Sequence, residues 1–128
     1  HQRLLFYKRI SNTDTQEKLD NIRMELIDRF GIPPQSVKQL FSVHQLRLKA
    51  EQLGITKIDV NNNGGYIEFS PDTPVQAISI IQLMQNNPTY YRMEGGQRLK
   101  VTVQLVEYDK RIQFIVDLLN KLLNELHS

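Results

Sequence analysis

The sequence predicts an α+β fold in which about five helices pack on a small, mostly antiparallel sheet that contains a β-hairpin. Apolar residues recur at helical spacing through both ends of the chain, and the spacing changes to strict alternation in residues 55–70 and 98–105. A length of 128 residues with 40% hydrophobic content suits one core. We therefore expect a single domain over residues 1–128.

The composition argues against several classes of protein. The chain has no cysteine, no apolar run long enough to span a membrane and no secretory signal pattern, so we expect a cytoplasmic protein without a membrane partner. Its 16 basic and 14 acidic residues give a net charge of +2, which is too balanced to predict nucleic-acid binding. The chain begins at His1 rather than Met, and we expect a piece of a longer protein.

Two helices are predicted in the first thirty residues. In the segment RLLFYKRI, Leu4, Tyr7 and Ile10 lie at helical spacing, although a strand remains the alternative over so few residues. A second helix is predicted over residues 14–30, where Thr13 and Gln16 fit a capping box. One apolar stripe runs along it, and Gly31 can close it in a left-handed conformation. The stripe consists of Leu19, Ile22, Leu26 and Phe30.

A third helix is predicted from Pro34 to Gly54, because proline is favoured in the first turn of a helix. Its apolar residues occupy two sides, so we expect both sides to be covered. One side carries Val37, Leu40, Phe41, His44 and Leu48, and the other carries Leu46 and Leu53. His44 has no second histidine three or four residues away, which favours a hydrogen-bonded, partly buried imidazole over a metal ligand.

The segment ITKIDVNNNGGYIEFS predicts a β-hairpin, since apolar residues alternate on both sides of its Asn-Gly turn. We expect Asn63 and Gly64 to supply the positive backbone angles of that turn. A strand rather than a helix follows the glycines, which argues against a phosphate-binding loop.

Three further elements complete the predicted fold. A helix over residues 74–86 is expected to be capped by Asp72 or Thr73 and to bury Val75, Ile78, Ile81 and Met84. Residues 98–105 alternate strictly and predict a strand with one solvated face. The last helix is expected to pack on its own domain through Tyr108, Ile112, Ile115, Leu119, Leu122 and Leu126.

The second helix carries a stripe of acidic and amide side chains opposite its apolar stripe. At about 100° per residue, this sector contains Asp14, Glu17, Asn21, Glu25 and Asp28. Such a stripe is most often a solvated surface. The adjacent Met24 favours a contact surface.

Two alternatives remain open from the residues alone. Tyr90 and Tyr91, with Arg92, Arg98 and Lys100 nearby, could form a stacking platform for single-stranded nucleic acid, although no known module pattern accompanies them. A small hydrolase built on paired carboxylates is the other, because such pairs leave no local motif.

Five segments in a fixed order resemble the C-terminal domain of the bacterial transcription-repair-coupling factors, the Mfd family. They are RLLFYKRI, ELIDRFGIPP, LRLKAEQLGI, GGYIEF and YRMEGGQRLKV, and the resemblance extends over residues 3–126. It implies a fragment of an ATP-driven DNA translocase that displaces stalled RNA polymerase and recruits the repair protein UvrA. No Walker-type loop or helicase motif occurs here, so the resemblance implies a non-catalytic domain without a cofactor; ATP and magnesium belong to the motor elsewhere in the protein.

The resemblance also implies a regulatory role. In the family, the C-terminal domain packs on a UvrB-like module of the same protein and masks the surface that binds UvrA. The acidic residues that contact basic side chains of this module correspond to Glu25 and Asp28. The implied partners are thus the UvrB-like module, indirectly UvrA and RNA polymerase, and double-stranded DNA for the whole protein. The isolated domain is expected to be monomeric.

Overall fold

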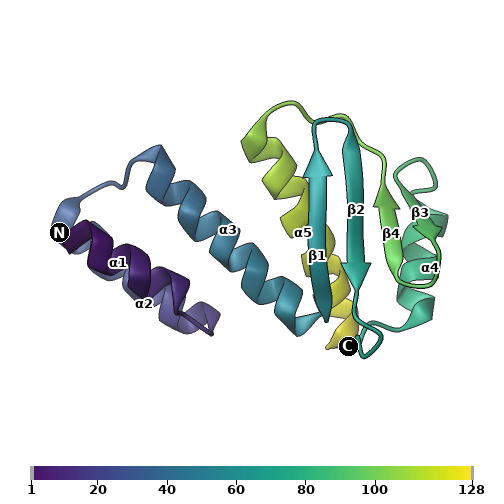
Figure 1. Cartoon of the computed structure of the whole chain (residues 1–128), viewed down its shortest axis with the longest axis horizontal. Helices are drawn as coiled ribbons and strands as arrows, with labels where there is room; N and C mark the ends of the chain where they lie inside the picture. Colours follow the sequence, from purple (N-terminus) through teal and green to yellow (C-terminus); the bar gives the residue numbers. More distant parts are fainter. Residues whose placement is uncertain (1, 128) are drawn as a thin grey trace. The chain divides into compact units, whose positions relative to one another are not determined.

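The chain folds into five helices and a four-stranded sheet in a computed structural model that describes the backbone of residues 2–127 and the side chains of residues 4–127. The elements are α1 (Gln2–Ser11), α2 (Gln16–Phe30), α3 (Gln35–Gln52), β1 (Ile55–Asn61), β2 (Gly64–Phe69), α4 (Ala77–Asn86), β3 (Tyr91–Glu94), β4 (Arg98–Val101) and α5 (Tyr108–Leu126) (Figure 1). The predicted α+β class is confirmed. The chain divides into two compact units, residues 1–48 and residues 49–128, and a single domain over the whole chain stays a prediction.

The first unit is built on α1, α2 and most of α3. Its core contains Phe6, Ile10, Leu19, Ile22, Leu26, Val37, Phe41 and Leu48. Gly31 closes α2 with a φ of 77°, as predicted. Leu46, on the other side of α3, is also buried, so α3 has buried apolar residues on two sides, as predicted.

Three details of α1 and α2 differ from the prediction. Thr15, not Thr13, caps α2 by accepting a hydrogen bond from the Lys18 N–H. Leu4 is exposed, because α1 turns Phe6 inward together with the predicted Ile10. Phe30, at the end of the predicted stripe, is also exposed on one side, while its ring meets Phe6 edge-on with the centroids 5.7 Å apart.

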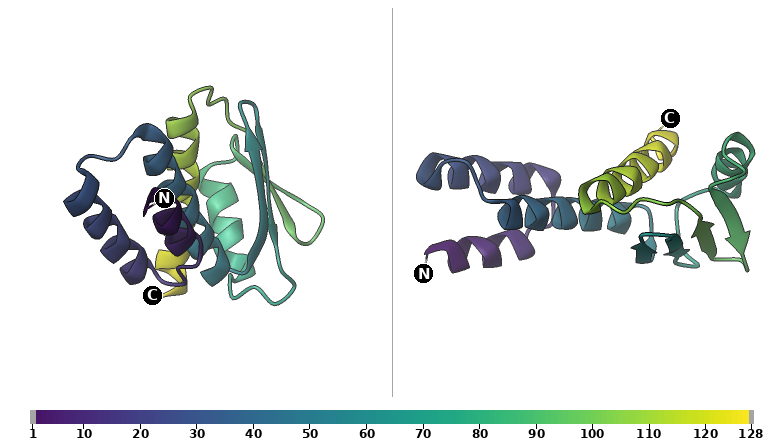
Figure 2. Two further views of the ribbon diagram at one scale, coloured as in Figure 1. Left: turned by 60° about the vertical axis from the view of Figure 1, so that its left-hand side comes forward. Right: turned by 90° about the horizontal axis from the view of Figure 1, so that it is seen from above.

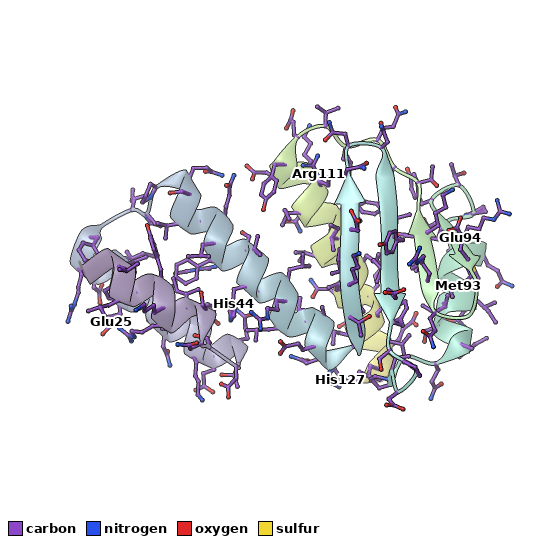
Figure 3. The ribbon with its side chains drawn as sticks, viewed as in Figure 1. Glu25, His44, Met93, Glu94, Arg111 and His127 are labelled. Atoms are coloured by element: carbon purple, nitrogen blue, oxygen red, sulfur yellow. The ribbon has the colours of Figure 1, made fainter. Side chains whose placement is uncertain are left out.

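Thr13 has a structural role in place of the predicted cap. It is buried, and its hydroxyl donates to the Arg9 carbonyl oxygen at 2.8 Å. Its own carbonyl oxygen lies 2.8 Å from Nε2 of His44, which is buried in α3 (Figure 3). The prediction of a hydrogen-bonded, buried His44 is therefore confirmed.

The second unit is an antiparallel sheet in the order β1-β2-β4-β3, with α4 and α5 on the same face (Figure 2). The strands turn their apolar side chains toward these helices, and the buried ones are Ile55, Ile67, Phe69, Tyr91, Leu99 and Val101. From α5, four residues are buried: Ile115, Leu118, Leu119 and Leu122. The last helix thus packs in its own unit, as predicted.

The hairpin is confirmed, but its turn lies one residue earlier than expected. Asn61 pairs with Gly64, so Asn62 and Asn63 form the loop. Gly64 has a φ of 112°, whereas no non-glycine residue of the described chain has a positive φ, so the expectation for Asn63 was wrong. Arg111 ties this loop to the segment before α5, because its Nη1 donates to Asn62 Oδ1 and to the Leu105 carbonyl oxygen (Figure 3).

The α4 prediction was wrong in its start and in its buried face. The Thr73 hydroxyl donates to the Leu53 carbonyl oxygen and accepts from the Val75 N–H, which holds this segment out of the helix. The helix begins at Ala77, with no side-chain cap. The buried residues of the helix are Ile80 and Leu83, while the predicted core residues Ile78 and Ile81 are 52% and 42% exposed and Val75 and Met84 are partly buried.

The second alternating segment forms a shorter strand than predicted. β4 ends at Val101 instead of residue 105, and its outward side chains include Lys100, so the solvated face is confirmed. The sequence did not reveal β3, which has only four residues. Among the described helices, none is long and apolar enough to cross a membrane.

Candidate functional site

The two predicted interface residues differ in their surroundings on α2. Asp28 is exposed, as expected. The side chain of Glu25 is 39% exposed, and its Oε2 forms an ion pair with Arg9 Nη1 of α1 at 2.5 Å (Figure 3). Glu25 is thus partly exposed and is also paired with a cation of its own chain, which the sequence did not predict. Successive helical residues are turned by about 100°, so Glu25 flanks the buried Leu26 and reaches the neighbouring helix.

Packing on the first unit holds Arg9 in this position. Its guanidinium carbon lies 5.0 Å from the centroid of the Phe6 ring, within the range of a cation–π contact. The guanidinium of Arg29 lies 5.9 Å from the same centroid. Arg9 thus places its guanidinium between a buried aromatic ring and the Glu25 carboxylate.

Exposed apolar side chains accompany this ion pair. Leu5 is 61% exposed one helical turn before Arg9, and Met24 is 64% exposed one turn before Asp28. We call Leu5, Arg9, Met24, Glu25 and Asp28 the α1–α2 surface. Contact surfaces are typically enriched in methionine and arginine, and methionine adapts to irregular partners.

The other members of the predicted acidic stripe are exposed and have local roles. Asp14 forms an ion pair with Lys18 at 3.0 Å, and the hydrogen bond and charge of Lys18 hold the pKa of this carboxyl below its usual range. Glu17 lies in the first turn of α2, where the helix dipole favours a negative charge. Asn21 is exposed.

The arrangement of the tyrosines does not favour the nucleic-acid alternative. Tyr91 is buried and stacks on Phe114 with the centroids 6.2 Å apart, so its ring is not available to a base. Tyr90 meets Phe114 edge-on. Arg98 and Lys100 form ion pairs with Glu68 at 3.2 Å and Glu94 at 3.6 Å, which reduces the positive charge of this sheet face.

Three grooves lie on the surface, and none contains the pair of carboxylates that the hydrolase alternative requires. The first, of about 240 Å³, is apolar and lies between α4 and the sheet, where Met84 and Met93 contribute to its lining. Two more polar grooves contain one carboxylate each, Asp14 in the first unit and Glu125 in the second. No cluster of His, Cys, Asp and Glu suited to a metal ion occurs in the part of the chain that the structure describes.

Comparison with known proteins identifies the family. Residues 1–80 match the family model described as the TRCF domain. The chain belongs to the transcription-repair-coupling factor family.

Relatives in this family match most of the chain. The transcription-repair-coupling factor of Haemophilus influenzae is 41% identical over 119 residues, which is 93% of this chain and 10% of that protein. The Escherichia coli factor is 40% identical over 120 residues, or 94% of this chain and 10% of that protein. The chain thus spans about a tenth of the length of these relatives.

A solved structure agrees with the fold. The crystal structure of a C-terminal domain of a transcription-repair coupling factor superposes with a TM-score of 0.78 over 94% of this chain and 78% of that chain. The two sequences are only 20% identical, so this comparison shows that the two chains share a fold. The resemblance drawn from five short segments is confirmed, while the interface role of Glu25 and Asp28 stays a prediction.

Sequence reasoning did not find Arg9. The residue lies 16 positions from Glu25, and their contact depends on how α1 is aligned against α2. The spacing of Phe6 and Ile10, which face inward, would have placed Arg9 beside the buried stripe of α1. That signal was obscured because Leu4, which is exposed, was assigned to the apolar face with Tyr7 and Ile10, whereas Phe6 was not.

Proposed function

We propose that this chain is a non-catalytic, regulatory C-terminal domain of a transcription-repair-coupling factor. It docks on the UvrB-like module of the same protein and covers the surface that binds UvrA. Membership of the family supports this role, as do matches of 93% and 94% of the chain to two full-length repair-coupling factors. ATP, magnesium, double-stranded DNA and RNA polymerase are proposed to engage other parts of the whole protein, which acts in the bacterial cytoplasm.

The observation that carries the proposal is the exposure of acidic groups on one side of α2. Asp28 is exposed and Glu25 is partly exposed, so basic side chains of a partner can reach both. Leu5 and Met24 add exposed apolar area next to these charges. A polar rim with a few apolar contacts is the composition expected of a contact between domains that must separate again.

The strength of such a contact suits a switch. An exposed ion pair contributes up to about 1 kcal/mol, so two pairs supply a bias that a competing partner can overcome. Charged rim contacts also weaken as salt screens them. The proposed docking is therefore reversible when the protein engages a stalled polymerase.

A binding measurement tests this function. The 128-residue chain is titrated into the separately produced UvrB-like module of the same protein, at low and at moderate salt. We expect binding that weakens severalfold as the salt concentration rises and that UvrA competes away. If the module does not bind at low salt, or if UvrA binds the preformed complex as well as the free module, the proposal is wrong.

A control titration with single- and double-stranded DNA addresses the other candidate. Nucleic-acid binding by phosphate contacts would fall steeply with salt. We expect no DNA binding at moderate salt, because the carboxylates of Glu68 and Glu94 already engage Arg98 and Lys100. Salt-dependent micromolar binding of DNA would contradict this.

A further inference from the structure

Glu25 carries a cation of its own chain in the position where a docking partner would place one. Oε2 of Glu25 contacts Nη1 of Arg9, and the two side chains are 39% and 50% exposed. The pair is therefore open to solvent on one side. An incoming ammonium or guanidinium group can reach the carboxylate only beside Arg9 or in its place.

We propose that Arg9 is a built-in competitor that weakens docking of the α1–α2 surface on a basic partner. The inference rests on the function proposed above and assigns to Arg9 the task of keeping that contact reversible. Asp28, at an exposed position, attracts the basic partner. Arg9 reduces the contribution of Glu25 to the affinity for that partner.

Two physical effects give Arg9 this role. If the partner's cation shares the carboxylate, it lies close to the Arg9 guanidinium, and like charges at such a distance repel. If it displaces Arg9, the docked state loses an existing ion pair. Either effect lowers the affinity for a basic partner, by up to roughly fivefold for exposed charges.

The same contact favours the undocked state. When the partner leaves, Arg9 again neutralises Glu25, so undocking does not expose an unpaired carboxylate beside the apolar core. The packing of Arg9 on Phe6, at 5.0 Å from the ring centroid, keeps the guanidinium near Glu25 and reduces the conformational freedom lost in re-forming the pair. Arg9 thus destabilises the docked state and stabilises the undocked state, and both effects favour undocking.

The test uses the full-length repair-coupling factor that carries this chain. Arg9→Met removes the charge and keeps an unbranched side chain that can still cover Phe6, and Arg9→Gln serves as a second variant if Met at this position lowers the melting temperature. The matched control is Lys18→Met, which also removes one positive charge and one ion pair, with Asp14, on the same unit. Lys18 lies seven residues from Glu25, or about 10 Å along α2.

The readout is the affinity for UvrA at fixed moderate salt. We expect Arg9→Met to weaken UvrA binding by roughly three- to fivefold, because a tighter docked state covers the UvrA surface more of the time. Lys18→Met should stay within about twofold of the parent, since solvent screening separates it from Glu25.

Failure of this inference is distinguishable from failure of the proposed function. If Glu25→Ala with Asp28→Ala strengthens UvrA binding but Arg9→Met does not weaken it, the role of Arg9 is overturned and the proposed function stands. If Lys18→Met weakens UvrA binding as much as Arg9→Met, net charge rather than the Arg9–Glu25 pair is responsible, and the role of Arg9 is again overturned. If none of these variants changes UvrA affinity, both proposals are wrong.

Discussion

Nε2 of His44 lies 2.8 Å from the carbonyl oxygen of Thr13, and this contact joins α3 to the turn between α1 and α2. Both residues are buried. A buried carbonyl oxygen that loses its hydrogen-bond partner has a desolvation cost that is not offset. The pair therefore helps to fix α3 against the helix that carries the α1–α2 surface.

Replacement of His44 by Leu should lower the free energy of unfolding by about 1–3 kcal/mol, because the Thr13 carbonyl oxygen loses its partner. Urea melts followed by circular dichroism would measure the change. Lys38→Ala, at an exposed position of the same helix, should stay within about 0.5 kcal/mol. Equal effects of the two variants would show that the His44 contact does not stabilise the unit.

Leu26→Ala should destabilise the chain by roughly 2–5 kcal/mol, since it leaves a cavity in the core of the first unit. Asn21→Ala, on the exposed side of α2, should change the stability by less than about 0.5 kcal/mol. Denaturant melts of both variants would test the assignment of the two faces of α2. Similar losses would mean that the faces are assigned incorrectly.

Three glycines allow backbone strain and steric overlap to be separated. Gly95 has a φ of 68° and open space around it, whereas Gly64 has a φ of 112° and an added Cβ would overlap the Val101 carbonyl oxygen. Gly96 has neither constraint. Substitution by alanine should therefore cost little at Gly96, about 1–2 kcal/mol at Gly95, and the most at Gly64, where overpacking adds about 1–3 kcal/mol.

Equilibrium unfolding of these three alanine variants provides the measurement. The closeness of Val101 means that Gly64 is constrained by steric overlap as well as by its positive backbone angle. If Gly64→Ala costs no more than Gly95→Ala, the close approach of the Val101 carbonyl has no energetic weight.

Tyr91 should make stability depend on alkaline pH. Burial, with a contribution from Tyr90, raises the pKa of its phenol from 10.0 to about 12. The folded state therefore holds this proton more tightly than the unfolded state, so the contribution is fully present below pH 10 and is lost as the pH rises toward 12.

Tyr91→Phe should flatten this dependence while it keeps the ring stacked on Phe114. The unfolding midpoint in urea, measured below pH 10 and again near pH 12, would show a smaller fall for the variant than for the parent. Equal falls in the unfolding midpoint for the variant and the parent would mean that the pKa of Tyr91 is not raised in the folded state.

Long or strongly patterned segments were predictable from the sequence. The buried stripe of α2, the hairpin and α5 each repeat their signal over several residues, and the structure agrees with these predictions except at Phe30 and Tyr108, which are exposed. The face of α4 was not predictable, because tertiary packing decides which side of a helix meets the sheet. Its start was not predictable either, because a hydrogen bond from Thr73 to the Leu53 carbonyl, twenty residues away, holds the preceding segment out of the helix. β3 has only four residues and is held by its pairing with β4.

The candidate site was predictable only in part, for a similar reason. Helical periodicity placed Asp28 on the exposed side of α2, as observed. It could not assign a partner to Glu25, because Arg9 comes from another helix and the contact depends on tertiary packing. The family resemblance selected these two residues from the acidic stripe, which periodicity alone could not do.

The central claim is that Glu25 and Asp28 hold a reversible contact that covers the UvrA-binding surface. Its most direct test is the affinity of UvrA for the full-length protein with Glu25→Ala and Asp28→Ala together, at fixed moderate salt. The control is Asp14→Ala with Glu17→Ala, which removes two charges near the start of the same helix. Loss of an exposed contact of up to about 1 kcal/mol at Asp28, and of a smaller one at Glu25 because of Arg9, should strengthen UvrA binding by several- to about tenfold, with little change in the control. Unchanged UvrA affinity in a correctly folded Glu25/Asp28 variant would contradict the claim.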